Sequence, residues 1–270
     1  MEENSHSLKF DNAQLATGVR LHYAVQGDSN GPPIIFLHGY TDSWFSFSRI
    51  FPYLSKSFRS FAISQRGHGD SEKPTGAYSM LGMAEDILAF IESMNLQKVT
   101  LVGHSMGSLV AQEVALFAPE HLARLVLVGS ATNLRSEELF EMQRHVDGLS
   151  DPVPQEFARA FQVSTIYHPI PEDFLNQVIS ESLKLTAHVW REALRGQLEF
   201  DTTARVKQIK VPTLVLRGDR DEIFPRDAQQ ATEAIPNAVF KLYAETGHAL
   251  HWERPREFVA DLEEFIKRTS

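Results

Sequence analysis

Ser105 lies in a short segment whose residue types and spacing could make a nucleophile. The segment G-H-S-M-G at residues 103–107 follows an apolar run, residues 99–102, and opens a helical pattern. A tight turn between a buried strand and a helix would project the serine hydroxyl above a sheet, and glycines flank it where chains approach too closely for a Cβ atom. The alternative is a serine that only caps the helix. The strand-turn-helix context favours the nucleophile.

A serine hydroxyl becomes an effective nucleophile only when a base takes its proton, and His248 is the best placed histidine. It follows the predicted strand 239–243 by a short loop, which would bring it to the carboxyl edge of a sheet. His38 and His104 stand inside backbone motifs, where we expect them to hold loops. His251 could pair with His248 around a metal ion, but no third distal ligand supports that geometry, so we predict a capping or packing role and no metal site.

The base in turn needs a carboxylate that fixes its tautomer and stabilises its charged form. Asp219 and Asp221 both follow the predicted strand 213–216. Either could meet His248 at the same sheet edge. Aspartate also commonly shapes loops by accepting hydrogen bonds from nearby backbone N–H groups, which is the alternative role for whichever is not the partner.

The elements that must position these side chains alternate along the chain. Short apolar, β-branched runs alternate with longer amphipathic stretches, a pattern typical of a parallel sheet covered on both faces. Strands are predicted over residues 34–37, 60–63, 99–102, 125–128, 213–216 and 239–243, and helices over 83–94, 105–117, 227–235 and 255–267. The predicted fold class is therefore α/β, with a doubly wound, mostly parallel sheet.

The alternation breaks between Thr132 and Ala204, where several helical patterns and no convincing strand are found. We predict a helical cap (lid) over residues 132–204, inserted into a core of residues 1–131 and 205–270. Acidic residues outnumber basic ones in the cap, which disfavours a polyphosphate substrate. Aromatic residues at helical spacing usually pack within their own core. Some should nevertheless line a substrate pocket, and the candidates are Tyr40, Phe140, Phe157, Phe161 and Trp190.

Four motifs in register carry a resemblance to a known family. H-G-Y at residues 38–40, G-H-S-M-G at 103–107, G-D-R-D-E-I-F-P at 218–225 and G-H at 247–248 resemble the corresponding loops of the α/β-hydrolase fold superfamily, in its branch of lidded serine esterases, lactonases and C–C hydrolases. The resemblance spans nearly the whole chain. Residues 64–71 also resemble a family loop, with Ser64 where aspartate is usual.

The resemblance implies roles for individual residues. The triad would be Ser105, Asp221 and His248, with Asp221 preferred to Asp219 because its spacing from Gly218 and Pro225 matches the family's acid. The oxyanion hole would be formed by the backbone N–H groups of Tyr40 and Met106.

The implied activity is hydrolysis of a small or medium apolar carboxylic ester or lactone through an acyl-enzyme, without a cofactor. Relatives that open epoxides or displace halide use an aspartate nucleophile, so a serine at position 105 predicts acyl chemistry. Hydrolysis of a C–C bond beside a ketone, or perhydrolysis with peroxide, would use the same residues. Two other classes remain open: a ligand-binding receptor with a vestigial site, and a protein-interaction scaffold.

The composition of the chain excludes some classes of binding partner. The 270-residue chain is 43% hydrophobic and 23% charged, as in ordinary globular proteins. A net charge of -9 and the lack of a basic block argue against nucleic acid. No stretch is apolar enough to span a membrane, cysteine is absent and the first ten residues do not resemble a signal peptide. We therefore expect a cytoplasmic protein with a small-molecule substrate; its oligomeric state is left open.

Overall fold

The described residues, 8–76 and 78–269 of the computed structural model, form one eight-stranded sheet with the strand order β1-β2-β4-β3-β5-β6-β7-β8. The strands are β1 (Lys9–Gln14), β2 (Arg20–Gly27), β3 (Pro33–Leu37), β4 (Arg59–Ile63), β5 (Val99–His104), β6 (Leu122–Val128), β7 (Thr213–Gly218) and β8 (Val239–Tyr243). Neighbouring strands from β4 through β8 pair in parallel, whereas β2 pairs antiparallel with both β1 and β4. The predicted α/β class with a mostly parallel sheet is confirmed.

All six predicted strands are present, but the sequence did not predict β1 and β2. Strand β1 lies at the sheet edge and almost all of its residues are exposed, so it carries no apolar pattern. Strand β2 is only partly buried, and buried positions along it are interrupted by exposed or half-buried ones. Half-buried antiparallel strands give a weaker signal than the continuous apolar runs of a parallel sheet.

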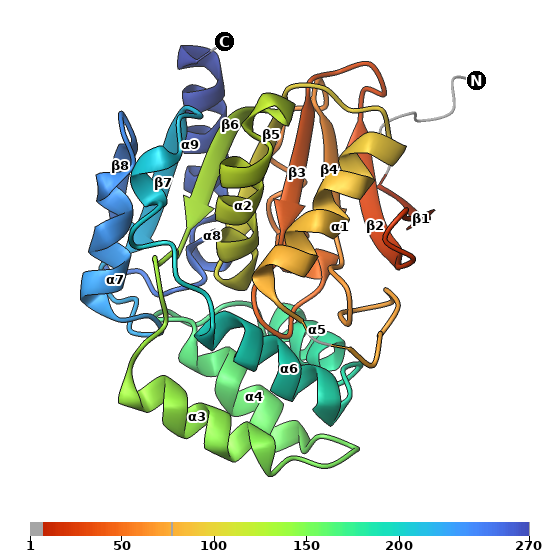
Figure 1. The fold of residues 1–270 in the computed structure, drawn as a ribbon, viewed down its shortest axis with the longest axis vertical. Helices are drawn as coiled ribbons and strands as arrows, with labels where there is room; N and C mark the ends of the chain where they lie inside the picture. The colour runs from red at the N-terminus through yellow and green to blue at the C-terminus, as the bar shows by residue number, and fades with distance from the viewer. Residues whose placement is uncertain (1–7, 77, 270) are drawn as a thin grey trace.

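Helices cover both faces of this sheet (Figure 1). Adjacent residues of a strand point to opposite faces. Ile35 accordingly belongs to the core beneath α1 (Met80–Ser93) and α2 (Met106–Phe117), whereas Phe36 belongs to the core beneath α9 (Pro255–Arg268). Helix α9 begins at Pro255, whose missing N–H costs nothing in the first helical turn. The helix predicted over 227–235 is divided into α7 (Arg226–Gln230) and a 3-10 turn, Ala231–Ala234.

Four helices lie together beyond the carboxyl ends of the parallel strands, at the bottom of Figure 1. They are α3 (Glu137–Asp147), α4 (Gln155–Ser164), α5 (Glu172–Ser182) and α6 (Ala187–Leu198). Helix α3 packs against α6, and α4 packs against α5. All four helices fall within residues 132–204, the range in which a helical cap is predicted. Its behaviour as a separate cap stays a prediction.

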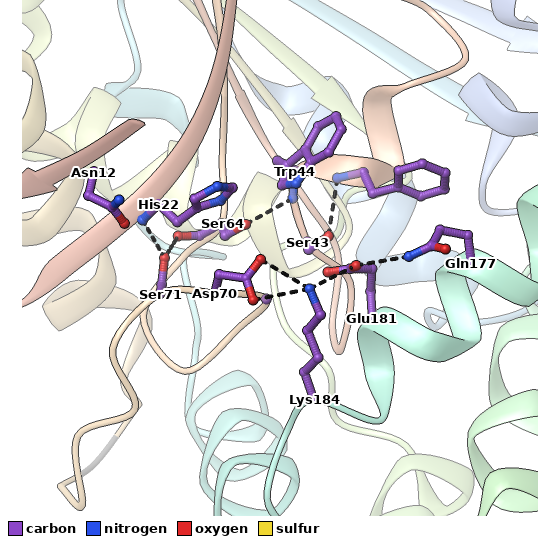
Figure 2. Close-up of polar contacts among 12 residues, drawn as sticks. Asn12, His22, Ser43, Trp44, Ser64, Asp70, Ser71, Gln177, Glu181 and Lys184 are labelled. Atoms are coloured by element: carbon purple, nitrogen blue, oxygen red, sulfur yellow. Dashed lines mark hydrogen bonds and ion pairs between the residues drawn. The ribbon is translucent and has the colours of Figure 1, made fainter. Parts of the chain in front are cut away.

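An ion-pair cluster joins this helical layer to the sheet (Figure 2). Lys184, which follows α5, lies 3.0 Å from an oxygen of Asp70 and 3.0 Å from an oxygen of Glu181. Gln177 donates a further hydrogen bond to Glu181 over 3.1 Å. Asp70 belongs to the loop that follows β4, so the cluster connects the α5–α6 junction to the core. The ion pairs are partly exposed, and we expect each to contribute at most about 1 kcal/mol.

The same region shows the contacts of Ser64, the residue that departs from the family loop which residues 64–71 resemble (Figure 2). Its hydroxyl accepts a hydrogen bond from the backbone N–H of Trp44 over 3.2 Å. Its carbonyl accepts one from the Ser71 hydroxyl, which itself accepts from the N–H of His22. A serine therefore meets the hydrogen-bonding needs of this loop.

In the part of the chain that the structure describes, no helix is both long and apolar enough to cross a bilayer.

Candidate active site

Ser105 stands at a sharp turn between β5 and α2. Its backbone adopts φ 52° and ψ -122°, a left-handed conformation that a non-glycine residue rarely adopts. A Cβ atom at Gly103 would lie 2.2 Å from the Gly107 carbonyl oxygen, and one at Gly107 would lie 2.3 Å from the Leu37 carbonyl oxygen. Only glycine fits at either position. The tight turn predicted from the sequence is therefore present. Its glycines are needed because the chains approach too closely there for a Cβ atom, as the sequence analysis predicted.

The Ser105 hydroxyl is not used to cap the helix. Although Ser105 occupies the N-cap position of α2, its side chain accepts no capping hydrogen bond. Its backbone N–H is held by the Val128 carbonyl at 2.9 Å, which fixes the turn against β6. The side chain therefore remains available at the N-terminus of α2, where the helix dipole favours developing negative charge.

His248 and Asp221 form a buried pair at the carboxyl edge of the sheet. Nδ1 of His248 lies 2.8 Å from Oδ2 of Asp221, and the residues are 2% and 1% exposed. Asp221 also accepts the backbone N–H of Ile223 over 3.1 Å. Asp219 instead accepts the N–H of Thr246 over 3.3 Å and so shapes the loop before His248. Asp221, the acid that the family resemblance implies, is therefore the one of the two aspartates that contacts the histidine.

Gly129 makes room for the His248 ring. This glycine directly follows β6 and has φ +52°, and a Cβ atom there would lie 2.9 Å from His248 Nδ1. The imidazole can therefore lie directly against the end of β6 while its Nδ1 contacts Asp221. The loop carrying His248 is further held by Glu253, which accepts the backbone N–H groups of Gly247 and Tyr167.

Ser105 and His248 line the same small hollow beneath the helical layer. Nε2 of His248 is buried and has no hydrogen-bond partner among the described residues, the Ser105 hydroxyl included. Hydrogen bonds between a nucleophile and its base are often long in the absence of substrate and shorten in the reactive complex. The arrangement therefore places a base and a hydroxyl at one cavity, with the base oriented by a carboxylate.

The other histidines near the site hold structure, as expected. His38 Nε2 accepts the backbone N–H of Gln65 over 3.0 Å, and His104 Nε2 lies 3.3 Å from the His248 carbonyl oxygen. His251 packs within the core, with its Nε2 3.1 Å from the Ser46 hydroxyl. Burial lowers the pKa of all three, that of His251 to about 3. No cluster of three or more potential metal ligands occurs among the residues that the structure describes.

The loop after β3 approaches the nucleophile closely. A Cβ atom at Gly39 would lie 3.1 Å from the Ser105 Cβ atom. The next residue, Tyr40, and the first residue of α2, Met106, have backbone N–H groups that make no hydrogen bond within the described residues. Two free N–H groups beside Ser105 are what an oxyanion hole requires. The Tyr40 hydroxyl donates a 2.6 Å hydrogen bond to the Trp190 carbonyl, which ties this loop to α6.

Two hollows of different chemistry meet at Ser105. The more polar one, the polar hollow, has a volume of about 10 Å³. Its walls combine Asp42, Gln162, Thr165 and His248 with the aromatic rings of Tyr40, Phe161 and Trp252. The apolar one has a volume of about 20 Å³ and is walled by Tyr40, Leu134, Leu139, Met142, Phe161, Leu194, Gln197, Ile223 and Phe224. An outer chamber of about 460 Å³ shares Leu139, Met142, Phe161, Ile223 and Phe224 with the apolar hollow. The outer chamber therefore adjoins the apolar one.

The structure corrects part of the predicted pocket. Tyr40 and Phe161 line both hollows, and their contact with a substrate stays a prediction. Trp190 is fully buried and, with Phe157, packs behind Tyr40 and Phe161 without lining either hollow. Phe140 is wrong as a pocket residue, because it lies on the outward face of α3 and is 42% exposed. Its neighbour Leu139 lines the apolar hollow instead.

Two polar residues at the site were missed by the sequence analysis. Asp42, in the loop after β3, and Gln162, near the end of α4, both line the polar hollow and contact each other over 3.0 Å. Asp42 could have been singled out from the sequence, because it follows the H-G-Y segment by only two residues. Gln162 carried no signal, since its role depends on how α4 packs over the sheet.

Comparison with known proteins decides the family. Residues 32–255 match the family described as the alpha/beta hydrolase fold. The chain belongs to this family. The α/β-hydrolase is 29% identical to a non-heme chloroperoxidase of Streptomyces lividans, over 93% of this chain and 97% of the relative. It is 26% identical to a bifunctional esterase/perhydrolase of Acinetobacter calcoaceticus, over 93% and 97% of the two chains.

A solved structure shows the same fold. The α/β-hydrolase superimposes on an esterase from Exiguobacterium antarcticum with a TM-score of 0.86 and 22% identity, covering 95% of this chain and 98% of the esterase. Membership of the α/β-hydrolase family identifies the chain as an enzyme of the hydrolase type.

Proposed function

We propose that this α/β-hydrolase cleaves small or medium-sized apolar carboxylic esters or lactones through an acyl-enzyme on Ser105. The observation that carries the proposal is the buried His248–Asp221 pair, whose His248 lines the same hollow as Ser105. A base oriented by a carboxylate and placed beside a hydroxyl at a strained turn is the arrangement that acyl transfer requires.

In the first half of the reaction, Ser105 Oγ attacks the carbonyl carbon of the ester while His248 Nε2 takes the hydroxyl proton. Asp221 keeps the proton of Nδ1 in place and stabilises the imidazolium that forms. The backbone N–H groups of Tyr40 and Met106 hold the oxyanion of the tetrahedral intermediate. The intermediate collapses when the bond to the alcohol oxygen breaks, and His248 returns its proton to that oxygen.

The walls of the cavity support the substrate class. The hollow beside Ser105 is mostly apolar and small, with a volume of about 20 Å³, which suits a short acyl group. The outer chamber of about 460 Å³ could take a larger remainder of the substrate. We propose that α3 to α6 act as the lid over this path, because Leu139, Met142 and Phe161 from these helices line it.

Perhydrolysis is the second candidate function. It would use the same residues, with hydrogen peroxide replacing water as the second nucleophile and a peracid as product. The esterase/perhydrolase of Acinetobacter calcoaceticus, 26% identical to this chain, favours keeping it. The amounts of peracid and carboxylic acid formed from one ester in the presence of peroxide would distinguish the two activities.

The proposal is tested by rapid mixing of the enzyme with p-nitrophenyl acetate, p-nitrophenyl butyrate and a small lactone. We expect a burst of p-nitrophenol equal to the enzyme concentration with the aryl esters, and turnover of the lactone. The Ser105→Ala variant should bind an apolar ester and release no burst. A receptor or scaffold predicts no turnover by the wild-type protein, which would refute the proposal.

A further inference from the structure

Asp42 is a second carboxyl group at the candidate active site, and the acylation steps above give it no role. It lies in the loop after β3, is only 3% exposed, and lines the polar hollow together with Ser105 and His248. A buried acid is costly to maintain without compensating contacts. Its position beside the nucleophile and the base therefore needs an explanation.

Both oxygens of Asp42 are held in place. Oδ1 accepts a hydrogen bond from Gln162 Nε2 over 3.0 Å, and Oδ2 accepts one from the Ser46 hydroxyl over 3.2 Å. Gln162 Nε2 is itself fixed by Thr41 and Ser182 at 3.2 and 2.8 Å. A carboxyl group has about four lone-pair sites, so these two bonds leave it able to accept more.

The hollow in front of Asp42 has the size of a water molecule. Its volume is about 10 Å³, and a buried cavity needs on the order of 10 Å³ to hold one water, provided that two or more polar partners are present. Asp42 supplies one partner. Nε2 of His248 supplies another, because it is buried and unpartnered among the described residues. The neighbouring hollow is lined mainly by apolar side chains and suits the acyl chain instead.

Asp42 can bind a water molecule in either of its protonation states. Burial raises its pKa to about 7, against the lowering effect of hydrogen bonds from Gln162 and Ser46 and of the nearby His248. Near neutrality the group is thus present in both forms. In each form at least one oxygen can accept a hydrogen bond from water.

We propose that Asp42, held by Gln162 from α4, positions the water molecule that hydrolyses the acyl-enzyme. The water donates one proton toward Asp42 and the other toward His248 Nε2, which leaves an oxygen lone pair free to attack the acyl carbon. As the new C–O bond forms, His248 takes the second proton. The tetrahedral intermediate then expels Ser105 Oγ, which receives that proton from His248, and the carboxylic acid leaves.

This inference rests on the proposed acyl-enzyme and concerns its second half, so the two steps must be measured separately. With p-nitrophenyl acetate, the burst rate reports acylation, and the loss of the acetyl group from the intact protein by mass spectrometry reports deacylation. We expect Asp42→Leu to slow deacylation about 10- to 100-fold, the factor that corresponds to one lost hydrogen bond in a buried site. Acylation should change by less than about 3-fold.

Asp42→Asn is the conservative variant. It keeps the shape and an acceptor oxygen, so deacylation should recover to within about 5-fold of wild type. Asp70→Leu is the matched control, because it makes the same replacement in a neighbouring loop and loosens the contact with Lys184 without touching the hollow. It should leave both steps unchanged. If Asp42→Leu does not fold, Gln162→Met should slow deacylation in the same direction, since it removes the amide that holds Asp42.

Three results would overturn the inference: equal slowing of both steps by Asp42→Leu, no recovery in Asp42→Asn, or the same slowing in Asp70→Leu. Failure of the wild-type enzyme to form an acetyl-enzyme at all would instead refute the proposed function. The two failures are therefore distinguishable.

Discussion

Oδ2 of Asp221 lies 2.8 Å from Nδ1 of His248, whereas Asp219, two residues earlier, accepts the backbone N–H of Thr246. The two aspartates follow the same strand and differ in what they contact. Only Asp221 can orient the imidazole.

This difference predicts unequal effects of the same mutation. Asp221→Asn should lower kcat by about 10⁴-fold, because an amide at this position favours the wrong tautomer of the histidine. Asp219→Asn keeps an oxygen that can accept the Thr246 N–H and should lower kcat by less than about 5-fold. Steady-state rates with p-nitrophenyl acetate compare the two. Similar losses in both variants would contradict the assignment.

The walls of the apolar hollow predict a change in chain-length preference. Leu139 faces this hollow from α3, and its replacement by alanine should raise kcat/KM for a hexanoyl ester relative to an acetyl ester by about 10-fold. Phe140→Ala removes a larger side chain from the exposed side of the same helix and should leave the ratio unchanged. A panel of p-nitrophenyl esters measures both. If Phe140→Ala changed this kcat/KM ratio and Leu139→Ala did not, the pocket would lie on the Phe140 side of α3, which would contradict the assignment.

A buried ion pair outside the site predicts a large effect on stability. Arg66 contacts Asp86 through two hydrogen bonds of 2.5 and 2.7 Å, and Thr17 donates a third to the same carboxylate. Their side chains are 15% and 2% exposed, so Asp86→Ala leaves a guanidinium with little access to water. We expect a loss of about 3–5 kcal/mol in the free energy of unfolding. Glu85→Ala, at an exposed position of the same helix, should change it by less than about 0.5 kcal/mol in urea denaturation.

Buried histidines predict that the fold loses stability in acid. Burial lowers the pKa of His68 to about 4 and that of His251 to about 3, below the unfolded value of 6.5. Below pH 6.5 the unfolded chain therefore binds protons that the folded protein does not. Each such histidine should remove about 1.4 kcal/mol of stability per pH unit as the pH falls from 6.5 toward its folded pKa.

The acid effect can be assigned by mutation. His251→Gln should flatten the decline between pH 6.5 and 5, when the free energy of unfolding is measured against that of wild type at each pH. His145→Gln, at an exposed position on α3, should leave the decline unchanged. An identical slope in wild type and His251→Gln would show that this histidine becomes protonated in the folded state.

The sequence alone was enough to predict the positions of residues whose place in the fold is set by local chain geometry. The turn at Ser105 and the strands before Asp221 and His248 could be predicted because tight turns and buried parallel strands have strong local patterns. Leu139 and Phe140 show where this stops. Both are apolar neighbours on one helix, and only the packing of α3 over the sheet decides which one faces the cavity.

Asp42 and Gln162 could not be predicted for a related reason. They are far apart in the chain and meet only because α4 lies across the loop after β3. No local pattern encodes a contact of this kind. Strand β1 was missed because its side chains are exposed and carry no apolar periodicity.

The most direct test of the central claim is to trap and locate the covalent intermediate. Wild-type enzyme quenched in acid within the burst of p-nitrophenyl acetate hydrolysis should carry one acetyl group, and peptide mapping should place it on Ser105. The Ser105→Ala variant should carry none and show no burst. An acetyl group on another residue, or sustained ester hydrolysis by Ser105→Ala, would contradict the account.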